Sequence, residues 1–176
     1  MYFMKKLSIL VILLSLSFTN YAQKNIVKIN PFSLIFGVGK VTYENVLKEG
    51  SSIELSLTYS SLDLGILGKS KGLGGQAKYK IYFANEAPHG WYLAPAIGYS
   101  STKYSNDFND KFGINILNVA GLFGHQWIFG NNSGFTIDIN TGIRYNNATI
   151  EGDALWSGDG LGLAGNISFG WDLGNY

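Results

Sequence analysis

The sequence predicts an all-β fold, an eight-stranded antiparallel up-and-down transmembrane β-barrel. The clearest sign is the segment 135–145, in which apolar and polar side chains alternate from Phe135 to Tyr145 with only Thr141 out of phase. A β-strand sends successive side chains to opposite faces, so the pattern indicates a strand with one apolar and one polar face. Aromatic residues stand at both ends of the apolar face, as in strands that cross a lipid bilayer.

The composition also favours a membrane barrel. Charged residues make up 14% of the 176 residues, against about 25% in typical soluble domains. A soluble lipocalin-like binder would need a charged outer face and apolar residues inside, and this chain has too few charges to cover such a surface. The 23 glycines are nearly twice the usual share of about 7%. The absence of cysteine excludes disulfides, thiolate metal sites and a lipoprotein anchor.

Residues 1–22 are expected to form a signal peptide. Lys5 and Lys6 precede the apolar run 7–18, and Ala22 is a small residue before the expected cleavage point. The apolar run is shorter than the roughly 20 residues of a membrane-spanning helix, which leaves a short N-terminal anchor as the alternative. Residues 23–176 would then form one outer-membrane β-barrel domain. The formal net charge is +1 without any basic run, which argues against a nucleic-acid partner.

Past the signal, the sequence pattern has period two and predicts no further helix. The eight expected strands span residues 26–36, 39–47, 52–62, 72–84, 91–104, 112–129, 135–150 and 160–173. Compact turns are expected at 48–51, 85–90 and 130–134, and an even number of strands would place these turns and both termini on the periplasmic side. The remaining connections, at 37–39, 63–71, 105–111 and 151–159, would then face outward.

Individual strands differ in how clean the pattern is. In 26–36 the apolar residues move from odd to even positions, which predicts a β-bulge at Asn30-Pro31, where a proline is tolerated. Within 53–60, 76–83 and 161–173 the odd positions are apolar, apart from Gly165, and the even ones are polar or small. The segment 112–129 is ambiguous, because Ile114 and Ile116 disagree in parity with Leu117 and Val119.

The polar faces collect eight charged residues, which are expected to form a network inside the barrel. They are Lys28, Glu44, Glu54, Lys78, Lys80, Asp138, Arg144 and Asp172. All but Arg144 are expected in the periplasmic half or near its rim. The interior of an eight-stranded barrel is just wide enough to be filled by side chains, and a buried charge must be paired. The network is interpreted as a structural salt-bridge plug, with a binding or proton-relay site as the alternative.

Other motifs do not support catalysis or cofactor binding. His125 has no serine beside it and lies at the wrong membrane face for a lipid deacylase, and His89 lies in a turn. The segment 67–70 resembles the end of a P-loop, but Asp63 stands where the motif needs glycine. The segment 107–110 lacks the glycine and the final glutamate of a calcium-binding EF-hand loop. No catalytic residue, metal site or cofactor is therefore expected, and the protein is expected not to be an enzyme.

Two short segments carry a family resemblance, which extends as a pattern over the whole mature chain. With Asn25–Pro31 in the first strand and Val41–Glu44 in the second, the chain resembles a family of small Gram-negative outer-membrane β-barrels of unassigned function. The resemblance implies an outer-membrane location and a barrel fold, and it brings no catalytic residues. Trp171 fits the outward parity of the aromatic residue that ends the last strand in barrel-assembly signals. Outer-membrane lipids and the barrel-assembly machinery are thus expected partners of a monomer.

The leading functional hypothesis is a plugged barrel that acts as a structural or surface-interaction protein through its extracellular loops. Trp156 lies in the acidic segment 146–160 and is a candidate contact residue, since tryptophan is favoured at binding hot spots; the alternative is that it joins the outer aromatic girdle. The competing functions are a narrow pore or transporter for small solutes, and a lipid-modifying outer-membrane enzyme.

Overall fold

The computed structural model describes residues 25–63, 68–84, 86–105, 111–129, 134–151 and 157–173. Eight strands and one short helix occupy these ranges. The strands are β1 Asn25–Ile29, β2 Val38–Lys48, β3 Ser51–Asp63, β4 Lys69–Tyr82, β5 Gly90–Ser105, β6 Lys111–Phe129, β7 Phe135–Glu151 and β8 Ser157–Asp172, and the helix is α2 Pro31–Ile35. The expected signal peptide, residues 1–22, lies outside the described residues.

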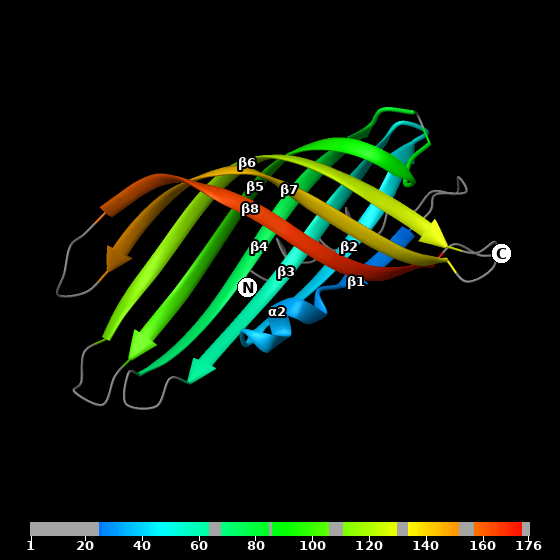
Figure 1. The fold of residues 1–176 in the computed structure, drawn as a ribbon. Coiled ribbons are helices and arrows are strands. Elements are labelled where there is room, and N and C mark those ends of the chain that lie inside the picture. The colour runs from blue at the N-terminus through cyan, green and yellow to red at the C-terminus, as the bar shows by residue number, and fades with distance from the viewer. Residues whose placement is uncertain are drawn as a thin grey trace, which may run out of the picture.

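Each strand pairs antiparallel with the next one along the chain, and β8 also pairs with β1, so the sheet closes into an up-and-down ring (Figure 1). The predicted architecture of eight antiparallel strands in a closed all-β sheet is confirmed. The observed β2 to β8 agree with the predicted strands to within a few residues at each end. The end of the barrel with the β2–β3, β4–β5 and β6–β7 turns is named here the lower end, and the opposite one the upper end.

The prediction for the first strand is wrong. β1 ends at Ile29, and the β-bulge expected at Asn30-Pro31 is instead the start of α2. The Asn30 side chain accepts a hydrogen bond from the Ser33 backbone N–H at 3.0 Å, and Pro31 begins the helix, where its missing N–H costs nothing. The change of parity in the sequence therefore marks a helical turn, and the expectation of no helix after the signal fails for the same reason.

Gly37 ends this turn and begins the path into β2. Its φ of +68° is in the left-handed region that favours glycine, and its N–H donates to the Leu34 carbonyl at 2.9 Å. A Cβ at this position would lie 2.6 Å from the Ser61 carbonyl oxygen. Among the described residues, no helix is both long enough and apolar enough to cross a membrane.

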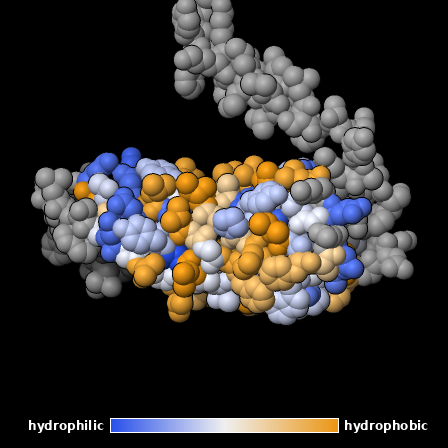
Figure 2. Space-filling model, turned by 90° about the horizontal axis from the view of Figure 1, so that it is seen from above, coloured by the Kyte–Doolittle hydropathy of each residue, from blue (hydrophilic) through white to orange (hydrophobic). Residues whose placement is uncertain are grey.

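The barrel wall is apolar outside and polar inside. Four leucines on its outer face are among the most exposed side chains: Leu57 (75%), Leu73 (68%), Leu161 (79%) and Leu163 (84%). Figure 2 shows hydrophobic residues over the middle of the visible face, with hydrophilic ones gathered toward its left end. β6 keeps one phase along its whole pairing with β7, so Ile114 and Ile116 share the inward parity. The ambiguity of this segment in the sequence therefore reflects apolar side chains on the inner face near the upper end.

The ring closes over a short contact between its first and last strands. β1 pairs with β8 only from Ile26↔Asp172 to Ile29↔Phe169. Above Phe169, β8 continues up to Ser157 and, within the described chain, pairs with β7 alone. Helix α2 stands where β1 would have continued, and its Phe32 ring lies 6.1 Å from that of Phe169. The wall is thus lower on the side of β1 and α2 than on the side of β5 to β8.

Candidate functional site

The lower lumen contains a cluster of six charged residues on five strands, named here the charge cluster. Its members are Lys28 on β1, Glu44 on β2, Glu54 on β3, Lys78 and Lys80 on β4, and Asp138 on β7. All occupy even positions, which face inward on these strands, and none is more than 3% exposed. Strand parity alone therefore explains why residues far apart in the sequence converge on one point.

Two lysines each bridge the same three carboxylates. The Nζ atom of Lys28 lies 2.5 Å from Glu44 Oε2, 3.1 Å from Glu54 Oε2 and 2.6 Å from Asp138 Oδ2. The Nζ atom of Lys80 lies 3.1, 3.0 and 2.6 Å from the same oxygens. These short contacts compensate the desolvation of five buried charges, because each ammonium group faces several carboxylate oxygens.

Lys78 completes the charge balance. It lies opposite Glu54 in the β3–β4 register, and its Nζ is 2.6 Å from Glu54 Oε1. The charge cluster thus holds three lysines and three carboxylates. Three positive and three negative side chains are therefore paired within the lower lumen.

Uncharged side chains satisfy the remaining hydrogen-bonding groups of the charge cluster. Gln126 Oε1 accepts from both Lys28 and Lys80, at 2.8 and 2.7 Å. The hydroxyl groups of Tyr82 and Tyr92 donate to Glu44 and Asp138, at 2.9 and 2.5 Å. Sequence reasoning missed Gln126 and both tyrosines as part of the site. All three occupy even positions, which face inward on these strands, and this parity would have identified them.

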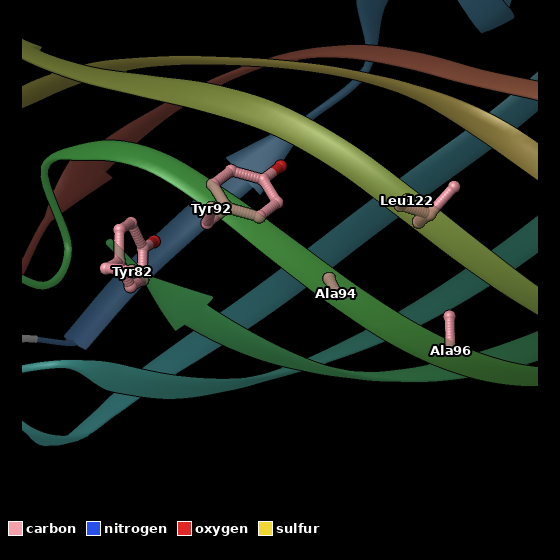
Figure 3. Packing of buried hydrophobic residues seen from close by; sticks show 5 residues of the cluster. All are labelled: Tyr82, Tyr92, Ala94, Ala96 and Leu122. Atoms are coloured by element: carbon pink, nitrogen blue, oxygen red, sulfur yellow. The ribbon is translucent and has the colours of Figure 1, made fainter.

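The two tyrosines also form an aromatic layer beside the charges. Figure 3 shows Tyr82 and Tyr92 close together, with Ala94, Ala96 and Leu122 further along the lumen. The two rings are 5.4 Å apart, and Lys80 Nζ lies 4.5 Å from the centre of the Tyr92 ring. The small, buried alanines that follow on β5 belong to the same packed cluster as the two tyrosines.

The three carboxylates alone would suit a metal ion. Oxygen atoms of Glu44, Glu54 and Asp138 lie within 4.8 Å of one another, and carboxylate oxygens are good ligands for hard cations. However, the ammonium groups of Lys28 and Lys80 already contact all three carboxylates. A metal ion would have to displace them, so the geometry favours an internal salt-bridge network over a metal centre.

Two charged residues of the predicted network lie outside the charge cluster. Arg144 stands higher on β7, opposite Ala120 and Gly162. Asp172 stands at the lower end of β8, opposite Ile26. Trp156 lies outside the described residues. The two ends of the predicted acidic loop 146–160 belong to strands, because β7 extends to Glu151 and β8 begins at Ser157.

A cavity of about 460 Å³, named here the upper cavity, lies above the charge cluster. Its polar lining includes Lys40, Lys78, Gln76, Asn118, Asn140, Arg144, Asn166, Thr58, Ser60, Ser100 and Thr102. Gly72 keeps this lining open, since a Cβ there would lie 2.5 Å from Thr102 Oγ1. The described lining residues include three cations and no carboxylate. Sequence reasoning missed Lys40, which shares the inward parity of Glu44 on β2.

The other sequence motifs lie away from the lumen. The His125 ring packs against those of Trp91 and Trp127, at 4.6 and 4.2 Å, near the lower rim. In the segment 67–70, Lys69 forms an exposed ion pair with Asp63 at 3.0 Å. The segment 107–110 is outside the described residues.

Comparison with known proteins gives no match among protein families, curated proteins or solved structures. The resemblance to small outer-membrane barrels, based on residues 25–31 and 41–44, therefore remains a prediction.

We expect Tyr92→Phe to destabilise the barrel by roughly 1.5–3 kcal/mol, the range for a hydrogen bond to a charged group. The substitution removes the hydroxyl group that donates to Asp138 Oδ1 at 2.5 Å, between two fully buried side chains. Urea unfolding of the protein in lipid vesicles, followed by tryptophan fluorescence, measures the change. Tyr99→Phe on the outer face of the same strand is the matched control and should be close to neutral; equal effects of the two substitutions would contradict the role of the hydroxyl.

Proposed function

We propose that the protein is a Gram-negative outer-membrane β-barrel with a closed lower lumen, acting as a structural or surface-interaction protein through its extracellular end. The observation that carries this proposal is the charge cluster. Its six side chains are buried and joined by contacts of 2.5–3.1 Å, which leaves little space for a continuous water-filled path. A narrow pore for small solutes is the alternative, and an interior bridged by opposing charges argues against it.

The outer surface supports a membrane location. The exposed leucines of the wall are numerous enough to form an apolar band, and such a surface is unfavourable in water. Outward-facing tyrosines stand toward its upper edge, at positions 59, 99 and 145. A larger aromatic group stands toward the lower edge, where Phe135 contacts both Phe169 and Trp171. Two aromatic levels flanking an apolar band are typical of transmembrane barrels.

The orientation and partners follow from this proposal. The lower end has the short turns and both ends of the sheet, which in bacterial barrels face the periplasm. The upper end would then face outward. Outer-membrane lipids would cover the apolar band, and the barrel-assembly machinery would insert a monomer whose Trp171 is exposed on the outer face of β8.

We expect the purified barrel, reconstituted in planar bilayers, to show little steady conductance, because the charge cluster obstructs the lumen. Correct folding is checked first on the same sample, since a closed barrel migrates differently in gels before and after boiling. A large general porin, recorded under identical conditions, serves as the control for the assay. Large, regular single-channel steps from the folded protein would contradict the closed lumen and favour the pore.

A further inference from the structure

The upper cavity has an excess of positive charge. Of its three cations, Lys78 is paired with Glu54 in the charge cluster below. Among the described residues, Lys40 contacts an amide oxygen, with its Nζ 3.4 Å from Asn166 Oδ1, and forms no ion pair. Arg144 likewise has no ion pair within the described part of the chain. Lys40 and Arg144 therefore add two positive charges that the described lining does not balance.

Arg144 also carries an unsatisfied donor. Its Nε atom is shielded from solvent and has no hydrogen-bond partner among the described residues. A buried donor without an acceptor is unfavourable, and native structures leave few of them. A bound oxyanion would provide acceptors for this group and would balance the charge. Arginine and lysine together with hydroxyl and amide donors are the groups that proteins use to bind phosphate and carboxylate.

The strand pairing of the barrel wall is interrupted beside the upper cavity, and this gap is named here the wall opening. Above Phe169, β8 has no strand partner on its β1 side within the described chain. Leu163 and Gly165, at outward positions of this part of β8, are among the residues that line the cavity. Outward residues of the fully paired strands β4 and β5 also line it, namely Leu73, Gly75 and Tyr99, so the end of the β1–β8 pairing is what places the opening at β8. The lower edge of this wall opening is closed by side chains, because Asn166 Oδ1 accepts from both Asn30, at 2.9 Å, and Lys40. Lys40 thus lies between the opening and the cavity, and Leu163 marks the outer side with 84% of its surface exposed.

We infer that the upper cavity binds the anionic head group of a single-chain amphiphile, a phosphate or a carboxylate, whose hydrocarbon chain leaves through the wall opening past Leu163. Lys40 and Arg144 hold the head group, and the apolar surface of β8 and α2 accompanies the chain. The cavity volume of about 460 Å³ is within the range of small-ligand sites. The inference rests on the proposed membrane location, since only there does the opening face a hydrocarbon phase.

Dodecyl phosphate is the first probe. Titrated calorimetrically into the folded barrel in a nonionic detergent, it should bind saturably to the wild type. Lys40→Met and Arg144→Met should each weaken binding by about tenfold or more, as expected for the loss of a charged hydrogen-bond donor. Both variants should keep the gel shift of the folded barrel, because neither residue belongs to the charge cluster. Lys71→Met, on the exposed outer face of β4, is the control and should leave binding unchanged.

Inorganic phosphate separates a lipid-borne ligand from a soluble one. It should bind much more weakly than dodecyl phosphate, because it makes no use of the wall opening. Equal affinity for both probes would contradict the inference that the ligand is an amphiphile. Binding that the Lys40→Met and Arg144→Met substitutions leave unchanged would contradict the placement of the site in the upper cavity. Absence of binding to a barrel that passes the gel-shift and conductance tests would overturn the inference while leaving the proposed function intact.

The path of the chain is tested by site-specific quenching. Since the protein contains no cysteine, Leu163→Cys can be labelled with a single fluorophore, and Ile97→Cys on β5 provides a matched outward position away from the opening. A dodecyl phosphate brominated on its chain should quench the label at position 163 saturably, with the midpoint found by calorimetry. At position 97, quenching should rise in proportion to the amount of probe in the micelle and should not saturate at that midpoint. The same concentration dependence at both positions would overturn the lateral path.

Discussion

Lys80→Met should destabilise the barrel by about 3–5 kcal/mol, the usual effect of removing one partner from a buried ion pair. Lys80 is fully buried and contacts Glu44, Glu54 and Asp138, so its loss leaves an excess negative charge among buried carboxylates. Methionine preserves most of the side-chain volume, which limits the effect of a cavity. Urea unfolding in lipid vesicles gives the free energy, and Lys71→Met on the exposed face of the same strand should change it little.

A second substitution distinguishes charge balance from packing. Lys80→Met/Asp138→Asn removes one charge of each sign from the charge cluster, so the double variant should be more stable than the sum of the two single effects predicts. The coupling free energy between the two substitutions should therefore offset part of the destabilisation. It should be well above the few tenths of a kcal/mol seen between independent sites. Additive single effects would show that the two side chains do not interact as the 2.6 Å contact implies.

Strand parity explains why much of the charge cluster could be predicted from sequence. In the lower parts of β3, β4 and β7 the apolar and polar positions alternate, so the inward direction of Glu54, Lys80 and Asp138 follows from local sequence. Closing the sheet then brings inward residues of similar height together. Parity cannot supply the height, because height depends on the pairing of distant strands. Asp172 has the right parity, yet its register opposite Ile26 places it at the lower end of the barrel.

The features that sequence reasoning missed depend on short or non-local structure. Helix α2 has only five residues, too few for a helical period to emerge, and its one local signal was a capping Asn30 before Pro31. The wall opening depends on where β1 stops pairing with β8, a contact between the two ends of the described chain. The upper cavity depends on side-chain volume across several strands, including the glycine at 72 that makes room for Thr102.

Leu55→Arg/Ile139→Arg should prevent insertion of the barrel into lipid bilayers. Both side chains face outward in the apolar band: Leu55 lies below Tyr59 on β3, and Ile139 lies between Phe135 and Tyr145 on β7. Arginine on the lipid face costs roughly 2–4 kcal/mol near the middle of the bilayer, so two of them would offset much of the stability of a small domain. Folding into vesicles, scored by the shift in gel mobility without boiling, should fall strongly for the double variant and partly for each single one.

The same substitutions discriminate against a soluble barrel. Leu55 and Ile139 are 52% and 41% exposed, and in a water-soluble protein surface substitutions usually change stability by less than about 0.5 kcal/mol. Thr149→Arg is the matched control, because Thr149 is exposed on the same face of β7 as Ile139 but beyond Tyr145, toward the upper end. It should insert like the wild type, since at that height arginine reaches water. If Leu55→Arg/Ile139→Arg folds as well as Thr149→Arg, or is recovered folded without lipid or detergent, the apolar outer band does not contact a bilayer and the membrane location is wrong.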